Sequence, residues 1–260
     1  MDTGRADLVP DDDGRRGWTL FVNGVPSSHV DLDDPTRLDF EYVRWFAAAV
    51  DVLAPEGEPM RVTHLGGAGC TFARYVAATR PGSRQIVLEI DAAVLEVAKR
   101  AFALRSGPRL RLRVADARAG LADLADGGQD VVVRDAFAGA SVPSHLTTLE
   151  FLAEVRRVLA GDGLYLANLA DDPKLALARR EVATVLTSFD HVALIAEPGQ
   201  LNGRRYGNVV LVGSDDALPE APLVRRLASD AVPARWLGTD ELRGFASGYR
   251  PLRDPVTPAG

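Results

Sequence analysis

Short apolar runs alternate with amphipathic segments from residue 61 to residue 214. The apolar runs have the length and β-branched content of buried strands, and the segments between them carry apolar residues at helical spacing. Strands are predicted at 61–65, 84–90, 109–116, 129–136, 163–170, 191–197 and 206–214. Helices are predicted at 71–79, 92–104, 117–125, 146–160 and 174–189. This alternation predicts an α/β fold, with a mostly parallel sheet and helices on both faces.

The last two predicted strands break the alternation. Only the short glycine-rich connection 197–205 joins them, and it is too short for a crossover helix. We therefore expect them to be antiparallel neighbours. The sheet is expected to have seven strands and a Rossmann-like arrangement, mostly parallel with an antiparallel last strand.

The residues before this region predict a small separate element. β-rich residues surround Asn23-Gly24 over 18–30, a signal of a hairpin with a type I′ turn. Apolar residues at a spacing of three to four then predict a helix over 34–55. We expect four segments: a disordered tail at 1–16, the β-hairpin and helix at 17–55, the Rossmann-like domain at 56–215 and a C-terminal extension at 216–260.

Composition narrows the class of protein. Hydrophobic residues make up 47% and charged residues 25%, and the formal net charge is -6, so nucleic acid is not an expected partner. The single cysteine excludes an internal disulfide, and no Cys/His cluster has zinc spacing, so no metal is expected. No apolar run reaches 18 residues and the N-terminus is polar, so we expect a cytoplasmic protein without a membrane partner.

A glycine cluster follows the first strand of the alternating region. Gly66, Gly67 and Gly69 would let the backbone approach a ligand at the N-terminus of the next helix. Glu89 and Asp91 end the next strand about 20 residues later, where a carboxylate can accept hydrogen bonds from ribose hydroxyls. The motif fits a dinucleotide poorly, because Phe72 stands in place of the third glycine of G-x-G-x-x-G.

Two further acids end the following strands. Asp116 and Asp135 join the glycines and Glu89 at the carboxyl ends of four successive strands, where open α/β sheets bind ligands. This order predicts an adenosyl pocket, with Glu89 at the ribose, Asp116 at the adenine and Asp135 near the reacting carbon. The alternative is that these acids only cap the helices that follow them.

At this point the chain resembles the spermidine synthase family, within the class I methyltransferase fold, and most closely its short, actinobacterial-looking members. The similar motifs are "LGGAGCTFARYV", "LEID", "VADA", "DVVVRDAFAGASVPSHLTTLEFLAEVRRVLAGDGLYLANLA", and "FVNGV" followed by "FEYVR". They occur in the family's order and cover roughly residues 18–215.

The resemblance implies transfer of an aminopropyl group from decarboxylated S-adenosylmethionine to an amine. Asp135 matches the family's catalytic aspartate, and Tyr42 matches a tyrosine near the base and the substrate. Glu89 matches the ribose-binding acid of a motif that ends in Asp91. "VADA" ends in Asp116 and Ala117, which match the adenine-binding position. The resemblance also implies a possible homodimer, because the family often pairs through its N-terminal region.

The chain departs from the family at the acceptor side. Gly69 stands where the family has an aspartate that binds the amine of the aminopropyl arm, and Ala138 replaces a second polyamine-binding aspartate. Arg204 and Arg205 in the late substrate loop would repel a polyamine if they face the pocket. A buried cationic amine without counter-charges costs several kcal/mol.

Two further residues are candidates for the substrate side. His145 lies on the loop after Asp135, and Asn168 lies near the end of the next strand. Both are expected at the carboxyl-end rim of the sheet, where they could line the acceptor pocket.

The sequence leaves more than one function open. The leading hypothesis is aminopropyl transfer to an amine acceptor with Asp135 as general base. A second is methyl transfer from S-adenosylmethionine itself, which Gly69 favours because an aspartate there would repel the cofactor's carboxylate. A third is a catalytically degenerate nucleoside-binding or scaffold protein. An NAD-dependent oxidoreductase is disfavoured by Phe72.

Overall fold

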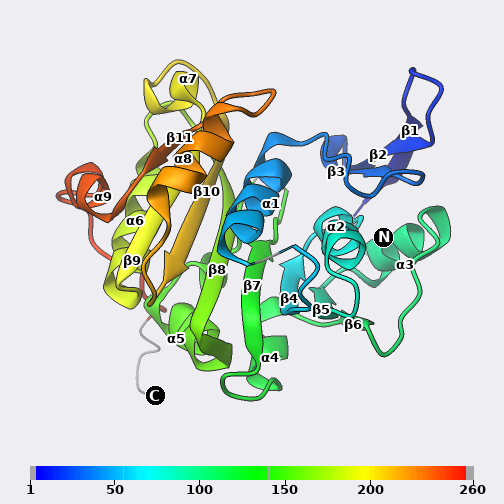
Figure 1. Cartoon of the computed structure of the whole chain (residues 1–260), viewed down its shortest axis with the longest axis horizontal. Helices are drawn as coiled ribbons and strands as arrows, with labels where there is room; N and C mark the ends of the chain where they lie inside the picture. The colour runs from blue at the N-terminus through cyan, green and yellow to red at the C-terminus, as the bar shows by residue number, and fades with distance from the viewer. Residues whose placement is uncertain (1–3, 55, 140, 256–260) are drawn as a thin grey trace.

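The structure is a computed structural model that describes residues 4–54, 56–139 and 141–255. Its centre is an eight-stranded sheet in the order β11-β9-β10-β8-β7-β4-β5-β6 (Figure 1). The strands are β4 (Arg61–Gly66), β5 (Arg84–Glu89), β6 (Leu110–Val114), β7 (Gln129–Asp135), β8 (Leu159–Asp171), β9 (His191–Ala196), β10 (Gly207–Ser214) and β11 (Arg235–Leu237). Neighbouring strands from β8 to β6 pair in parallel, so their carboxyl ends share one edge. We call this edge the rim. The strands end there at Gly66, Glu89, Val114, Asp135 and Asp171.

The last strands depart from the parallel pattern. β10 runs antiparallel to both β8 and β9, which confirms the predicted antiparallel pair. The expected count of seven strands is wrong by one, because β11 adds an antiparallel strand beside β9. β11 lies in the predicted C-terminal extension and has only three residues, two of them buried. So short a run shows no periodicity in the sequence.

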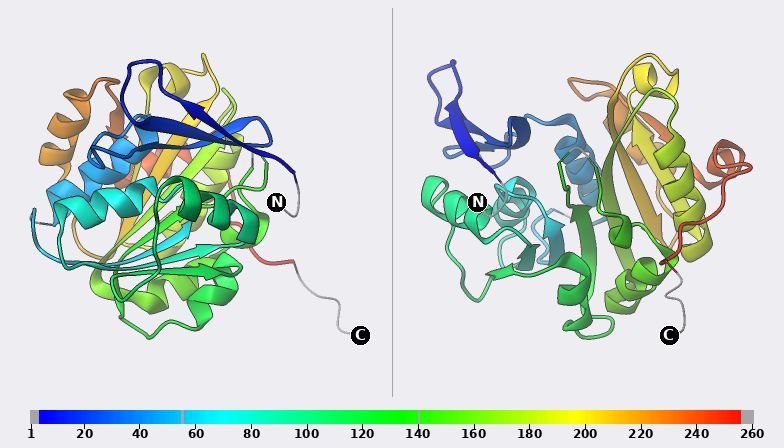
Figure 2. Two further views of the ribbon diagram at one scale, coloured as in Figure 1. Left: turned by 90° about the vertical axis from the view of Figure 1, so that its right-hand side faces the viewer. Right: turned by 180° about the vertical axis from the view of Figure 1, so that it is seen from behind.

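Helices cover both faces of the sheet (Figures 1 and 2). They are α1 (Glu41–Leu53), α2 (Thr71–Thr79), α3 (Ala92–Ala101), α4 (Ala117–Ala122), the 3-10 helix η1 (Ser144–Leu146), α5 (Leu149–Val158), α6 (Ala176–Ser188), α7 (Pro198–Leu201), α8 (Glu220–Ala228) and α9 (Thr239–Phe245). Alternation along β7 separates two cores: Val131 and Val133 pack with α1, α2 and α8, and Val132 packs with α4, α5, α6 and α9. Within the described ranges, none of the helices has the length and apolarity to cross a membrane.

The N-terminal element is a three-stranded antiparallel sheet of β1 (Ala6–Pro10), β2 (Gly17–Val22) and β3 (Val25–Asp31). The hairpin prediction is confirmed, because Asn23 and Gly24 both have positive φ between β2 and β3. The prediction of a disordered tail over 1–16 is wrong for β1, which pairs with β2 along its whole length. Arg37 forms ion pairs with Asp11 and Asp13 in the acidic turn after β1. Residues 1–3 of the predicted tail lie outside the described residues.

Helix α1 begins at Glu41, seven residues later than the predicted start at residue 34. The segment before it forms turns held by side chains. Asp31 accepts from the N–H groups of Asp33 and Asp34, and Asp34 accepts from the N–H of Thr36. Aspartate side chains that accept hydrogen bonds from nearby backbone N–H groups compete with helix formation. In this segment they stabilise turns, and no helix forms before Glu41.

The N-terminal sheet packs over the glycine-rich connection between β4 and α2. Leu20 and Val30 form a buried cluster with Cys70 and Ala73 and with the inner side of α3. The β2–β3 hairpin therefore borders the rim next to the glycine-rich connection.

Candidate active site

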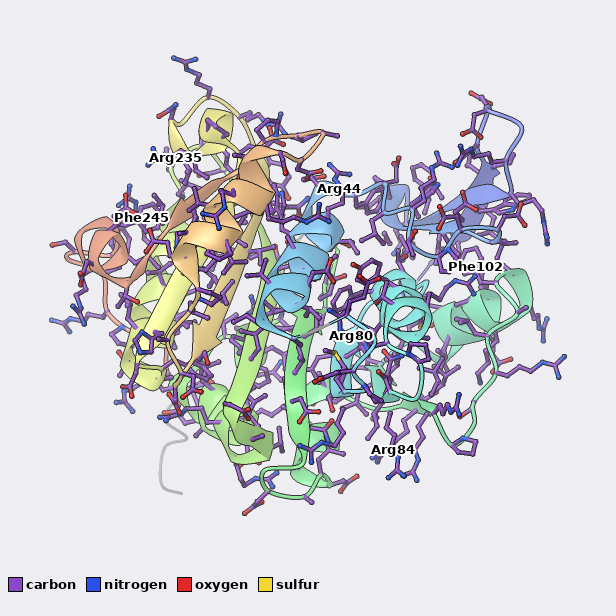
Figure 3. All side chains as sticks on the ribbon, viewed as in Figure 1. Arg44, Arg80, Arg84, Phe102, Arg235 and Phe245 are labelled. Carbon is purple, nitrogen blue, oxygen red and sulfur yellow. The ribbon has the colours of Figure 1, made fainter. Side chains whose placement is uncertain are left out.

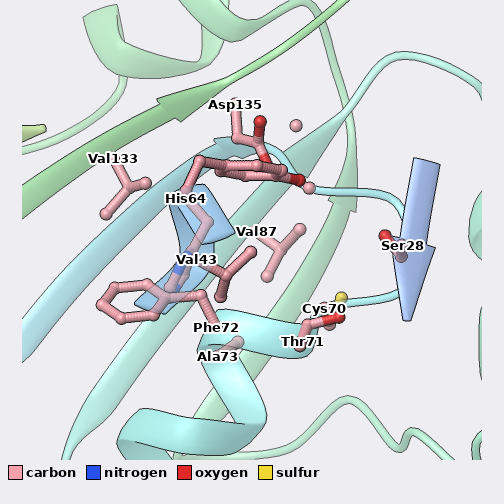
Figure 4. A pocket seen from close by; sticks show the side chains of 13 residues that line it. Ser28, Val43, His64, Cys70, Thr71, Phe72, Ala73, Val87, Val133 and Asp135 are labelled. Atoms are coloured by element: carbon pink, nitrogen blue, oxygen red, sulfur yellow. The ribbon is translucent and has the colours of Figure 1, made fainter. Parts of the chain in front are cut away.

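A pocket opens at the rim, between the glycine loop, the start of α1 and strand β3 (Figure 4). The residues that line it are Ser28, Tyr42, Val43, His64, Gly66, Gly67, Cys70, Thr71, Phe72, Ala73, Val87, Val133 and Asp135. Four residues predicted from the sequence, Tyr42, Gly66, Gly67 and Asp135, lie together in this lining. Cys70 and His64 also belong to it, and both are buried.

Gly66 brings two strand ends into close contact. It has a φ of +80°, and a Cβ atom at this position would lie 2.5 Å from the backbone oxygen of Asp135. The next N–H, that of Gly67, donates to the same oxygen at 3.1 Å. Only glycine permits this backbone conformation and this approach together, so the loop fixes the end of β7 against the end of β4.

The carboxylate of Asp135 is held by two hydrogen bonds from other elements. The Tyr42 hydroxyl on α1 donates to Oδ2 at 3.1 Å, and Asn168 Nδ2 on β8 donates to Oδ1 at 3.1 Å. Asn168 is 1% exposed, and its Oδ1 is buried without a hydrogen-bond partner among the described residues. Three predicted site residues thus meet, and a free acceptor lies beside the carboxylate.

The surroundings of Asp135 raise the pKa of its carboxyl group. Burial raises the pKa of Asp135 to about 6, although hydrogen bonds from Asn168 and Tyr42 and the charge of Arg134 lower it. Burial and the charge of Asp135 raise the pKa of Tyr42 well above 10. Tyr42 therefore stays protonated and donates, while Asp135 is a carboxylate near neutral pH that can accept a proton.

The acids at the end of β5 have different roles. Asp91 is the N-cap of α3, because its Oδ1 accepts from the N–H groups of Ala93 and Val94. Glu89 is half-buried and accepts from the Asp91 N–H at 3.0 Å. Burial raises the pKa of Glu89, and backbone hydrogen bonds oppose the rise. Beside it, Ile90 is 67% exposed and offers an apolar surface at the rim.

Asp116 and His145 pair at the start of α4. His145 Nε2 lies 2.8 Å from Asp116 Oδ2, while Oδ1 accepts from the Ala119 N–H and caps the helix. Burial raises the pKa of Asp116, but these hydrogen bonds outweigh it and the pKa is lowered. Ala117, the first residue of α4, is buried. His145 thus lies beside Asp116, and its expected role on the substrate side stays a prediction.

The C-terminal segment supports this corner of the rim. Arg118 donates to the His145 backbone oxygen. It also forms a bidentate ion pair with the Asp254 carboxylate, at 2.9 and 2.7 Å. Thr148 also donates to Asp254. The C-terminal extension therefore stabilises the start of α4 and the η1 segment. Within the described ranges, no three His, Cys, Asp or Glu side chains are grouped so that they could hold a metal ion.

Comparison with known proteins identifies the family. A sequence model of the spermine/spermidine synthase domain matches residues 47–212. A Vibrio vulnificus protein named polyamine aminopropyltransferase is 33% identical over 213 residues, which cover 81% of this chain and 68% of that protein. The chain belongs to the spermidine synthase family.

Solved structures agree with this assignment. A probable spermidine synthase from Corynebacterium glutamicum matches with a TM-score of 0.92 and 38% identity, over 100% of this chain and 96% of that chain. Human methyltransferase-like protein 13, solved in complex with SAH, has the same fold, with a TM-score of 0.60 and 20% identity over 84% of this chain and 98% of that chain. The expected methyltransferase-like Rossmann fold is confirmed.

The structure explains one departure from the spermidine synthase pattern. Gly69 does not line the pocket. Its N–H donates to the Ser28 hydroxyl at 2.9 Å, and a Cβ atom here would lie 2.7 Å from the Ser28 Cβ and 3.2 Å from the Phe102 ring. Phe102 lies between α3 and the N-terminal sheet (Figure 3). An aspartate at this position would displace the hairpin, so Gly69 and Ser28 are matched to each other.

The other departures repel a cationic substrate less than the sequence suggests. Arg205 pairs with Glu197 at 2.7 Å, so its charge is compensated, and Arg204 is exposed outside the pocket lining. Ala138 lies in an exposed turn, where it forms an isolated β-bridge with Ser141.

Sequence reasoning missed a carboxylate next to Tyr42. Glu41, the first residue of α1, accepts from Asn208 Nδ2 of β10 at 2.8 Å. Its charge contributes to the raised pKa of Tyr42, so it lies near that hydroxyl. No salt bridge to Glu41 is found in the described part of the chain. In the sequence, Glu41 is marked only by its place beside the matched tyrosine. An acid at that place is typical of any helix N-terminus, so it does not indicate a functional role.

Proposed function

We propose that this protein transfers an aminopropyl group from decarboxylated S-adenosylmethionine to an amine acceptor, with Asp135 as general base. The observation that carries the proposal is the half-buried Asp135 carboxylate, oriented by Tyr42 and Asn168 next to the glycine loop. The relative named polyamine aminopropyltransferase supports this choice of reaction.

The reaction requires an acceptor that attacks as a neutral amine. Its nitrogen forms a bond to the methylene beside the sulfonium, while the bond from that carbon to sulfur breaks and methylthioadenosine leaves. The amine proton passes to Asp135. Tyr42 and Asn168 hold the carboxylate in place.

The nucleoside would lie along the other half of the rim. Glu89 is the carboxylate for the ribose hydroxyls, with Gly66 and Gly67 allowing close approach. The exposed Ile90 side chain offers an apolar contact for the adenine, near Asp116 and Ala117. The helix-capping role of Asp91 leaves Glu89 as the ribose ligand at this strand end.

Glu41 supplies negative charge on the acceptor side. Asp135 alone would leave the second cationic group of a diamine without a counter-charge, because Gly69 and Ala138 carry no acid. Glu41 is half-buried near Tyr42 and has a neutral partner, Asn208. A carboxylate with no cation beside it is suited to an ammonium group of the acceptor.

A second candidate is methyl transfer from intact S-adenosylmethionine. The observation that favours it is Gly69, whose packing against Ser28 leaves no room for an acid that would bind the amine of the decarboxylated donor. The carboxylate of the intact donor would then meet no negative side chain at this position.

The deciding experiment is calorimetric titration with three ligands under the same conditions. These are decarboxylated S-adenosylmethionine, S-adenosylmethionine and methylthioadenosine. We expect the decarboxylated donor to bind at least tenfold more tightly than the intact one, a difference of about 1.4 kcal/mol. Tighter binding of the intact donor would move the protein to the methyltransferases. Binding of none would leave only a scaffold role.

The pH dependence of turnover provides a separate prediction. Asp135 must be a carboxylate to accept the proton, and its pKa is about 6. With saturating acceptor, kcat/KM for the donor should be level above this pH and fall about tenfold per pH unit below it. A profile that stays level down to pH 4.5 would mean that Asp135 is not the base.

A further inference from the structure

Behind Asp135, on the opposite face of the sheet, lies a fully buried guanidinium. Arg134 is 0% exposed, and its side chain points into the core beneath α5 and α6 because β7 alternates its side chains between the two faces. It forms an ion pair with Glu181 of α6 at 2.7 Å, and Glu181 is also buried. Removing both charges of such a pair from water costs free energy, and this pair lies directly behind Asp135.

The guanidinium connects two parts of the site. Arg134 Nη1 donates to the Leu146 backbone oxygen at 2.9 Å, and Nη2 donates to the Asn168 backbone oxygen at 3.3 Å. Leu146 follows His145 in η1, the 3-10 helix that comes after Asp135 in the chain and is called the His145 loop below. One side chain therefore holds the backbone of the His145 loop and of the residue that orients Asp135.

We propose that Arg134 and Glu181 form a positioning pair for the general base, in which the fork of Arg134 anchors the His145 loop and β8 and the balance of the two charges sets how readily Asp135 ionises. The electrostatic part rests on the proposed function of Asp135. The charge of Arg134 lowers the pKa of Asp135. Glu181 offsets part of that charge, and so keeps Asp135 basic enough to take a proton.

The other ionisable groups near this pair are few. On the pocket face, Tyr42 and Glu41 of α1 and His64 of β4 lie near Asp135. On the opposite face, Tyr165 and Asp171 of β8 lie near Glu181. Burial lowers the pKa of His64 to about 4 and raises that of Tyr165 well above its ordinary value. His64 and Tyr165 are therefore neutral where Asp135 titrates, and they do not mask its titration.

Two variants separate the charge from the hydrogen bonds. Glu181→Gln keeps the shape and removes the negative charge, while Arg134→Lys keeps the positive charge and removes the fork. The readouts are the titration of Asp135, followed by carbon-13 NMR of labelled aspartate carboxyls and assigned with Asp135→Asn, and the affinity for methylthioadenosine. Neither readout needs turnover. Asp51→Asn is the matched control, because Asp51 pairs with another fully buried arginine, Arg80, between α1 and α2 (Figure 3).

We expect Glu181→Gln to lower the pKa of Asp135 by about one pH unit with little change in nucleoside affinity. Arg134→Lys should leave the titration in place and weaken methylthioadenosine binding by about tenfold, the value of one buried hydrogen bond. Asp51→Asn should lower the melting temperature and change neither readout. An unshifted titration in Glu181→Gln, or wild-type nucleoside affinity in Arg134→Lys, would overturn the proposal. An inactive wild-type protein that gives both expected results would refute aminopropyl transfer and leave the positioning pair standing.

Discussion

Replacing Asp135 by asparagine should lower kcat by about 10²–10⁴-fold, the usual contribution of a general base. The variant keeps the shape of the side chain and loses only the ability to accept the proton of the attacking amine. The nucleoside contacts proposed for Glu89 and Asp116 are untouched, so the affinity for methylthioadenosine should stay within about twofold of wild type. Steady-state kinetics and calorimetry measure the two effects separately.

Asp130→Asn is the matched control for this experiment. This variant makes the same substitution on the same strand. Asp130, however, lies at the opposite end of β7 and pairs with Arg61 at the surface. It should retain wild-type kcat, since exposed ion pairs contribute about 0–1 kcal/mol to stability. Equal kcat for Asp135→Asn and Asp130→Asn would remove Asp135 from the mechanism.

The positions of the strand-end acids were predictable because two periodic signals agree. Each parallel strand is an apolar run, and the residue that ends the run must lie at the shared rim. Glu89 and Asp135 therefore appear at the rim as expected from their places in the sequence. The same reasoning did not separate site acids from caps: Asp91 and Asp116 end up bonded to the first turns of α3 and α4.

Contacts made across the fold were not predictable in this way. Arg134 finds Glu181 through the packing of α6 under β7, and no local pattern marks either residue as a partner. Gly69 meets Ser28 because the N-terminal sheet folds over the glycine loop. The sequence shows Gly69 only as a missing acid, whereas the structure shows a contact that an acid would break.

The second large effect is expected at Gly66, where the backbone of the glycine loop contacts the end of the strand that carries Asp135. An added methyl group would lie 2.5 Å from the Asp135 backbone oxygen and 2.9 Å from the Ala136 Cα, so backbone atoms would have to move. A positive φ costs an alanine about 1 kcal/mol or more, and forcing extra volume into packed structure costs about 1–3 kcal/mol.

Gly66→Ala should therefore lower the free energy of unfolding by about 2–4 kcal/mol, measured by urea denaturation. It should also lower kcat by about 100-fold, because displacement of the base by as little as about 1 Å can cost that much. Gly127→Ala is the control, since Gly127 has a φ of +60° with nothing within 4 Å of an added Cβ and lies away from the rim. It should lose only about 1 kcal/mol of stability and keep wild-type kcat. If the two variants are equally stable and equally active, the contact between Gly66 and Asp135 does not position the base, and the hydrogen bonds from Tyr42 and Asn168 are sufficient.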